Sequence, residues 1–283
     1  MLLSEIHKST KEKFDEFEIQ TSEIDSRTII KKILNLNDKD FIMDTKISLS
    51  NKESEYLSKV VLQRLSGKPL SRIFGSKEFF SMRFAINEFV LDPRPESEIL
   101  VEKALDLIQE NNLKSILELG VGSGCIIAAI LSNSIGTKAV GVDISEQAVM
   151  TAKSNLIKNG IKNFDLIVSD WGLSLNRTFD IIISNPPYIK TNEIKNLNKN
   201  EKDHDPLISL DGGLDGLDCY RVIANQSTHL INDKGYILVE IGHDQAKGVE
   251  KIFGNNDFLL TNKVKDYSNL DRVLIFVKKK IKK

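Results

Sequence analysis

Four consecutive residues, Asn185-Pro186-Pro187-Tyr188, carry the strongest chemical signal in the chain. Two adjacent prolines remove two backbone donors and stiffen the loop, which is a poor choice for folding alone. The Asn185 side-chain carbonyl and the Pro186 main-chain carbonyl can instead accept hydrogen bonds from both hydrogens of one NH2 group. Tyr188 can stack on the planar group that carries this NH2. The segment therefore predicts a clamp for a planar amide or amine nitrogen, with an ordinary turn as the alternative.

A glycine motif, Gly120-x-Gly122-x-Gly124, follows the apolar segment 115–119 and precedes a helical pattern. Glycines permit a tight turn and let a ligand approach the backbone closely. The loop lacks the Gly-Lys-Ser/Thr ending of a P-loop, and its third glycine follows the second by two positions where the dinucleotide fingerprint needs three. The spacing favours S-adenosyl-L-methionine over a triphosphate or a nicotinamide cofactor. Another kind of nucleotide loop, or a plain tight turn, is the alternative.

Polar and aromatic side chains near this loop fit the same ligand. Asp143 ends the next strand, 19 positions after Gly124, where a carboxylate can accept both hydroxyls of a ribose. Glu118 can accept from the ammonium of the methionine part, with a solvated strand end as the alternative. Trp171, the only tryptophan, can stack on adenine while Asp170 or a nearby backbone amide reads the base edge. A core tryptophan is the alternative here.

Together the two motifs predict methyl transfer to nitrogen. An amide nitrogen is a poor nucleophile because its lone pair is delocalised, and holding both its hydrogens encourages the lone pair to localise toward the methyl group. Positioning of this kind supplies about 7 kcal/mol or more in favourable cases. The sulfonium is already an activated leaving group, so neither a metal nor a covalent nucleophile is needed. None of the four histidines has the spacing of a metal pair.

Alternating strands and helices must position these motifs. Ligands of parallel sheets bind beyond the carboxyl ends of the strands, and every polar motif named above stands at such an end. The pattern indicates a mainly parallel sheet with helices on both faces. The expected strands are 115–119, 139–143, 164–168, 179–184, 235–241 and 272–277, and the expected helices between them are 99–108, 126–131 and 147–159.

The first third of the chain has a different character. Apolar residues recur at helical spacing over 26–34 and over 53–65, and Gly67-Lys68-Pro69 is expected to end the second helix. Weak alternation with aromatics predicts a short hairpin within 79–90. Asp92-Pro93-Arg94-Pro95 predicts a stiff extended link, because each proline fixes its own φ and restricts its predecessor.

Bulk properties narrow the class of protein. The 283 residues include 39 basic and 40 acidic side chains, so no global field holds the chain on nucleic acid or an anionic membrane. Two distant cysteines, Cys125 and Cys219, form no disulfide framework and favour a reducing, cytoplasmic compartment. The first 13 residues lack the apolar region of a signal peptide, and no apolar run approaches the roughly 20 residues of a membrane span.

At this point the chain resembles a known family, the release factor glutamine methyltransferases, also called HemK-type protein-(glutamine-N5) methyltransferases. The likeness covers about 25–277. The Asn-Pro-Pro-Tyr tetrad alone is not specific, because DNA adenine and ribosomal RNA guanine methyltransferases share it; the combination of motifs is. The motifs are Gly67-Lys68-Pro69-Leu70 with Ile73-Phe74-Gly75 and Glu78-Phe79-Phe80; Pro93-Arg94-Pro95-Glu96-Ser97-Glu98; the cofactor loop 118–124; and 185–188 with Asp205-Pro206-Leu207 and Asp211-Gly212-Gly213-Leu214-Asp215-Gly216-Leu217.

The resemblance implies an α/β fold: a Rossmann-like class I methyltransferase domain, over 96–283, with a mainly parallel seven-stranded sheet. It also implies an N-terminal helical bundle over 1–75 that docks the protein substrate, and a hairpin linker over 76–95. The substrate is then the glutamine of the Gly-Gly-Gln loop of peptide chain release factors, the cofactor S-adenosyl-L-methionine and its product S-adenosyl-L-homocysteine. No direct nucleic-acid or membrane partner is expected, and we expect a monomer.

Residue roles also carry over by position. The expected cofactor contacts are Glu118, Gly120, Val121, Gly122, Ser123, Gly124, Asp143, Asp170, Trp171 and Asn185, and the expected catalytic and substrate contacts are Asn185, Pro186, Pro187 and Tyr188. Two positions depart from the family pattern. Glu118 stands where Asp is common, and Val121 stands where Thr is common, which puts a side-chain contact at Val121 in doubt although the backbone amides remain.

Two other functions fit parts of the sequence. A nucleic-acid amino-methyltransferase could use Asn185 to clamp the exocyclic amine of a flipped adenine or guanine. It predicts a basic groove and a steep salt dependence, which the balanced charge does not favour. A non-catalytic cofactor-binding or interaction protein has no need of an intact clamp.

Overall fold

The computed structural model describes residues 2–197 and 202–279. Contacts within the chain divide it into two compact units, Met1–Gly75 and Ser76–Lys283. Each unit has apolar clusters of its own. Among the residues described, no helix combines the length and the apolar character that crossing a membrane requires.

The first unit consists of helices. They are α1 (Leu3–Glu16), α2 (Ser22–Leu34), α3 (Asp38–Ile42), α4 (Asn51–Leu65) and α5 (Leu70–Phe74). Both helices expected here are confirmed, and α4 ends before Gly67, whose φ is +96°. Ser50 caps the beginning of α4 together with Glu53: the side chain of each residue accepts a hydrogen bond from the backbone N–H of the other. Leu3, Phe14, Ile29, Ile30 and Val60 form its buried centre.

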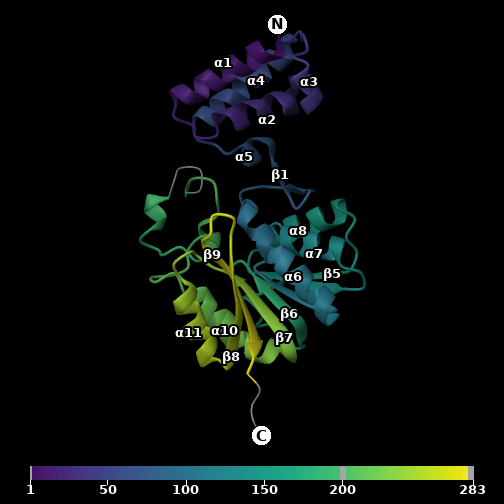
Figure 1. Ribbon diagram of the computed structural model, residues 1–283, viewed down its shortest axis with the longest axis vertical. Coiled ribbons are helices and arrows are strands. Elements are labelled where there is room, and N and C mark those ends of the chain that lie inside the picture. The colour runs from purple at the N-terminus through teal and green to yellow at the C-terminus, as the bar shows by residue number, and fades with distance from the viewer. Residues whose placement is uncertain (1, 198–201, 280–283) are drawn as a thin grey trace. The chain divides into compact units, whose positions relative to one another are not determined.

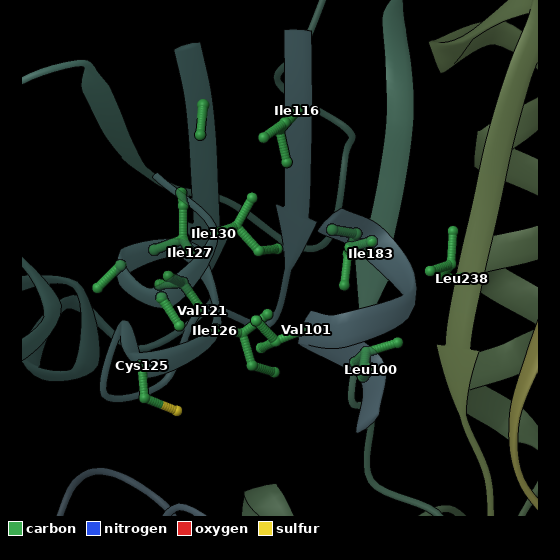
Figure 2. Close-up of a cluster of buried hydrophobic side chains, with 14 of the residues drawn as sticks. Leu100, Val101, Ile116, Val121, Cys125, Ile126, Ile127, Ile130, Ile183 and Leu238 are labelled. Atoms are coloured by element: carbon green, nitrogen blue, oxygen red, sulfur yellow. The ribbon is translucent and has the colours of Figure 1, made fainter. Parts of the chain in front are cut away.

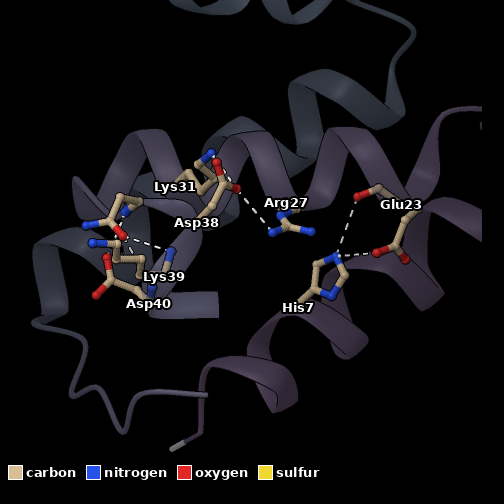
Figure 3. Close-up of polar contacts among 8 residues, drawn as sticks. His7, Glu23, Arg27, Lys31, Asp38, Lys39 and Asp40 are labelled. Atoms are coloured by element: carbon tan, nitrogen blue, oxygen red, sulfur yellow. Dashed lines mark hydrogen bonds and ion pairs between the residues drawn. The ribbon is translucent and has the colours of Figure 1, made fainter. Parts of the chain in front are cut away.

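Ion pairs connect the helices of this unit. Arg64 of α4 donates to Asp25 of α2 at 2.7 Å with both side chains about nine-tenths buried. At the surface, Figure 3 shows Asp38 accepting from Arg27 and Lys31, at 3.1 and 2.9 Å. Exposed pairs of the second kind contribute little to stability, so the apolar centre and the Arg64–Asp25 pair hold the unit together.

A seven-stranded sheet organises the second unit, in the order β5-β4-β3-β6-β7-β9-β8 (Figure 1). Neighbouring strands from β5 to β7 pair in parallel, and β9 runs antiparallel to both of its neighbours. The predicted mainly parallel sheet is confirmed. The strands are β3 (Ser115–Leu119), β4 (Lys138–Asp143), β5 (Phe164–Val168), β6 (Phe179–Ser184), β7 (Ile231–Glu240), β8 (Phe258–Lys265) and β9 (Asp271–Lys278).

Helices cover both faces of this sheet, as predicted (Figure 1). One face packs against α6 (Glu98–Asn111), α7 (Cys125–Asn133) and α8 (Glu146–Lys158). The other packs against α10 (Asp218–Leu230) and α11 (Ala246–Asn255). Figure 2 shows the first of these clusters, where Ile116, Ile183 and Leu238 of three strands meet Val101 of α6 and Ile127 of α7.

Strand order places the functional edge. The chain runs from β3 outward to β4 and β5, then crosses back to β6 on the other side of β3. The strand order therefore reverses between β3 and β6, and parallel sheets bind ligands beyond the strand ends at such a switch point. The glycine motif follows β3 and Asn185 follows β6, so both motifs border this crevice.

The hairpin precedes the sheet and lies earlier than expected. It consists of β1 (Ser76–Phe79) and β2 (Met82–Ala85), joined by Phe80 and Ser81 at φ +49° and +59°. Two central residues at positive φ are typical of a type I′ turn, which usually contains Asn or Gly. The hairpin lies within the linker 76–95 that the resemblance implies, but it begins before the range 79–90 indicated by the alternation, because Phe80-Ser81 lacks that turn signal. The link expected over 92–95 is irregular at 92–94, but Pro95 was wrongly included, since Pro95–Ser97 forms a short 3-10 helix, η1.

Candidate active site

A cavity of about 290 Å³ opens at the switch point between β3 and β6. This is near the lower end of the range usual for small-molecule sites. Its walls come from the strand ends, the glycine loop, the segment after the hairpin and the loop before α10. It is lined by 89–94, Ser97, Glu118, 120–123, Cys125, Ile126, 142–145, 169–171, Asn185, Pro187, Ile208, Ser209, Asp211 and Cys219.

The glycine loop turns sharply at positive φ. Gly120, Gly122 and Gly124 have φ of +78°, +51° and +78°, which only glycine adopts freely. A methyl group on Gly124 would lie 3.1 Å from the Ala152 side chain of α8, whereas one on Gly122 would meet nothing within 4 Å. A side chain at Gly124 would thus crowd α8, whereas Gly122 leaves open space at the cavity wall.

Most amides of the loop bond within the protein. Gly120 and Val121 both donate to the Val142 carbonyl, at 2.9 and 2.8 Å, and Gly124 donates to the Val121 carbonyl at 2.8 Å. The Val121 side chain is buried against Gly141, where a methyl group would approach it to 2.8 Å. Valine thus serves packing here, and the loop meets the cavity mainly through its glycine backbone.

Asp143 ends β4 and holds the loop in place. Its Oδ2 accepts from the Gly122 N–H at 2.9 Å and its Oδ1 accepts from the Ser145 N–H at 3.0 Å. Partial burial raises the pKa of this carboxyl, while these backbone donors oppose the shift. Each oxygen keeps a second lone pair, so the carboxylate can also accept a pair of hydroxyl groups from a ligand.

Glu118 is buried, with 2% of its surface exposed, so the alternative of a solvated strand end is wrong. Its Oε2 accepts from the Ile127 N–H at 3.0 Å, at the beginning of α7. Burial raises the pKa of this carboxyl well above its usual value. A buried acid at a cavity wall gains from a cationic partner, which suits a ligand ammonium.

Trp171 lines the cavity next to the glycine loop and has a strained backbone. Its φ of +50° is rare for a bulky residue and costs about 1–3 kcal/mol. A methyl group on Gly120 would lie 3.9 Å from its ring. The residue is half-buried: it packs against the second apolar cluster and also lines the cavity, so it is not a fully buried core tryptophan, and its stacking on adenine stays a prediction. Asp170 beside it is exposed at the rim.

The Asn-Pro-Pro-Tyr tetrad follows β6 and is held by a side chain that does not line the cavity. Asn185 and Pro187 line the cavity, whereas Pro186 and Tyr188 are not among its lining residues. The Tyr188 carbonyl accepts from Gln245 Nε2 at 2.8 Å. Burial raises the pKa of the Tyr188 phenol to about 12, so it stays neutral. Stacking of Tyr188 on a substrate remains a prediction.

Glycines of the downstream loop let it press against the tetrad. A methyl group on Gly212 would lie 2.8 Å from Tyr188 Cα and 2.9 Å from the Pro187 carbonyl, and one on Gly216 would lie 2.5 Å from the Tyr188 carbonyl. The two segments are also joined by backbone bonds, such as Gly212 N–H to the Ile189 carbonyl at 2.8 Å. Backbone contact at this distance leaves no room for a side chain, which explains the glycines at 212 and 216.

Sequence reasoning missed several contributors to the site. Arg94 donates to the buried Asp205 at 2.6 Å, which joins the link after the hairpin to the loop carrying Ile208 and Ser209. Ser97 accepts from Asn185 Nδ2 at 3.0 Å. Arg94, Ser97 and Asp205 lie in motifs identified by resemblance, yet their spacing in sequence gives no sign of these contacts.

The structure brings most of the predicted cofactor residues to one cavity. Of that set, Gly124 alone is not among the lining residues, because it packs behind the loop. No cluster of three or more His, Cys, Asp or Glu suited to a metal occurs in the described part of the chain. The cavity thus combines carboxylates that can accept from hydroxyl and ammonium groups with two residues of the tetrad, Asn185 and Pro187.

Comparisons with known proteins agree with this arrangement. Family models match the chain as "PrmC N-terminal domain" at 5–75, "Methyltransferase small domain" at 95–200 and "Eco57I restriction-modification methylase" at 153–276. A "Release factor glutamine methyltransferase" of Agrobacterium fabrum is 37% identical, over 89% of each chain. Another of that name from Caulobacter vibrioides is 34% identical, over 95% of this chain and 94% of the relative.

Solved structures are similar at the level of the fold. A methyltransferase from Pyrococcus furiosus matches with a TM-score of 0.51 at 16% identity, over 82% of this chain and all of that chain. The fold is therefore that of class I methyltransferases, with the seven-stranded sheet described above.

Proposed function

Since the chain belongs to the release factor glutamine methyltransferases, we propose that it methylates the side-chain amide nitrogen of the glutamine in the Gly-Gly-Gln loop of peptide chain release factors. The methyl donor is S-adenosyl-L-methionine, and S-adenosyl-L-homocysteine is the product. One observation carries the proposal: Asn185 and Pro187 line the same cavity as the glycine loop, Glu118 and Asp143.

The cofactor contacts are assigned from the hydrogen-bonding and stacking capacity that each residue keeps after its contacts within the protein. Asp143 would hold the ribose hydroxyls with the lone pairs that Gly122 and Ser145 leave available. Glu118 would accept from the ammonium group, because a buried carboxyl favours a cationic partner. Trp171 would stack on the adenine, with Asp170 at its edge. The bound cofactor supplies an activated methyl group.

The substrate nitrogen would be held by two carbonyls, those of the Asn185 side chain and the Pro186 main chain. Asn185 already donates its NH2 to Ser97, so its carbonyl oxygen is the group left to face a substrate. Two acceptors match the two hydrogens of a planar primary amide. They select for planarity more strongly than they select against a charged ammonium. The protein's own contribution is thus orientation and exclusion of water around a nitrogen that needs no prior deprotonation.

We also propose a reducing, cytoplasmic setting. Both cysteines are free: Cys125 is buried and Cys219 is half-buried. Burial raises the pKa of the Cys125 thiol to about 12 and that of the Cys219 thiol to about 11, so neither is primed to react. This supports the compartment expected from cysteine usage.

Transfer of a labelled methyl group tests the function. The protein is incubated with labelled cofactor and a release factor, then with the same factor whose Gly-Gly-Gln glutamine is replaced by alanine. We expect label in the first and none in the second. Equal labelling of both would reject the proposed target, and labelling of RNA or DNA instead would favour the alternative of a nucleic-acid amine.

A further inference from the structure

A buried chain of hydrogen bonds lies behind the clamp. Asn185 Nδ2 donates to Ser97 Oγ at 3.0 Å, and Ser97 Oγ donates to Glu240 Oε2 at 2.6 Å. Ser97 and Glu240 are only 2% and 1% exposed. Burying a carboxyl costs free energy, so the burial of Glu240 next to the clamp indicates a function for this side chain.

Strand register explains why these residues meet. Ser184 pairs with Val239, so Asn185, directly after β6, lies beside Glu240, the last residue of the neighbouring strand β7. Side chains alternate along a strand, and Ile183 and Leu238 point into the cluster beneath α6. Asn185 and Glu240 therefore face the same side, where Ser97 ends η1 and immediately precedes α6.

The donors and acceptors in this chain have only one consistent order when Glu240 is ionised. A carboxylate only accepts, so the Ser97 hydroxyl must donate to it and offers its lone pair to Asn185. Asn185 must then turn its NH2 toward Ser97 and its carbonyl away. Resting on the function proposed above, we propose that Ser97 and Glu240 are positioning residues that orient the Asn185 amide so that its carbonyl meets the substrate NH2.

Protonation of Glu240 would undo this order. Burial raises the pKa of Glu240 to about 7, while the Ser97 hydroxyl and then Arg272 favour the charged form. Glu96 raises this pKa further and Arg94 lowers it; the phenols of Tyr188 and Tyr220 complete the groups that interact with it. A protonated Glu240 can donate to Ser97, whose hydroxyl can then donate to Asn185. The Asn185 amide would then turn over, and its NH2 group would face the NH2 group of the substrate in place of its carbonyl.

The sign of the pH dependence follows. The ionised form of Glu240 is the competent one and its pKa is near 7, so methyl transfer should rise with pH through that value and fall below it. Glu240→Gln removes this titration and no longer fixes the direction of the Ser97 hydroxyl, because a glutamine amide can either donate to Ser97 or accept from it. Its profile should be low and without the step near pH 7.

Kinetics of four variants test the proposal. Ser97→Ala and Glu240→Gln should lower kcat by about 10- to 100-fold, as a misplaced reacting group does, with the cofactor Kd unchanged in calorimetry. Ser97→Thr keeps the hydroxyl and should restore most of the rate. The matched control is Ser227→Ala, which removes another buried hydroxyl, one without a hydrogen-bond partner among the described residues; its rate should equal the wild type. Wild-type kcat and pH profile in both Ser97→Ala and Glu240→Gln would overturn the proposal.

A second readout does not depend on the substrate. The side-chain amide resonances of Asn185, identified by their loss in Asn185→Ala, should shift with a midpoint near pH 7 in the wild type and not in Glu240→Gln. Resonances that titrate identically in both proteins would overturn the relay even if transfer is observed. Absence of transfer by the wild type would reject the proposed function alone, because this titration still decides on the relay.

Discussion

At the scale of single residues, the site separates holding the cofactor from holding the substrate. Asp143 accepts from the glycine loop and lines the cavity, whereas Asn185 bonds away from the loop, to Ser97. These two residues can therefore be removed with different consequences, which gives two predictions.

Asn185→Ala should reduce methyl transfer by about 100-fold or more, because the substrate nitrogen loses an acceptor and its orientation. Cofactor affinity should stay within about twofold, since the other cofactor residues remain. Single-turnover kinetics and calorimetry measure the two effects. A rate near the wild type would contradict the clamp.

Asp143→Ala should instead weaken cofactor binding by about tenfold or more, about 1.4 kcal/mol, because the ribose acceptors are lost and the Gly122 N–H loses its partner. Calorimetric titration with S-adenosyl-L-homocysteine gives the Kd. The Kd of Asp143→Asn, which keeps one acceptor oxygen, should lie between those of the wild type and Asp143→Ala. An unchanged Kd in Asp143→Ala would remove this residue from the cofactor site.

The residues that sequence reasoning missed share a physical cause. Ser97 and Glu240 are separated by more than half of the chain, and their contact depends on α6, which begins just after Ser97, packing against β7. Motif spacing carries no information of that kind. The tetrad and the glycine loop were predictable because their chemistry is contained in adjacent residues.

At the scale of elements, the ends of the strands determine where the polar groups of the site lie. Predicted bounds match β3, β5 and β6, since each is a run rich in apolar residues with polar residues or glycine beyond its end. The edge strand β8 was not predicted, because most of its side chains are exposed or half-exposed and its alternation is weak. The hairpin was displaced because its turn residues are atypical.

Glycine substitutions measure how tightly the cofactor loop packs. Gly124 and Gly160 have nearly the same φ, +78° and +75°, but a methyl group on Gly124 would lie 3.1 Å from Ala152 and one on Gly160 would meet nothing within 4 Å. Both alanine variants carry the cost of positive φ, about 1–2 kcal/mol.

Only Gly124→Ala should carry a further packing cost, with a larger fall in the free energy of unfolding of the second unit and a weaker affinity for the cofactor. Denaturant unfolding with and without S-adenosyl-L-homocysteine compares them. Equal losses in both variants would mean that α8 does not constrain the loop.

At the scale of the whole molecule, the two units have separate apolar cores. Every residue lining the cavity lies between Phe89 and Cys219, within the second unit. The first unit matches the "PrmC N-terminal domain" model, and we propose that it docks the protein substrate.

A fragment beginning at Ser76 separates cofactor binding from docking. It should bind S-adenosyl-L-homocysteine with a Kd close to that of the full chain, because the cavity is complete within it. Its kcat/KM for a release factor should fall by about tenfold or more through loss of docking. Equal kcat/KM for fragment and full chain would assign the docking to the second unit instead.

Tandem mass spectrometry of a release factor, after incubation with the protein and S-adenosyl-L-methionine, locates the added methyl group. We predict one methyl group, on the side-chain amide of the Gly-Gly-Gln glutamine, and none after incubation with Asn185→Ala. A methyl group at any other residue, or an unmodified loop after full consumption of the cofactor, would contradict the account.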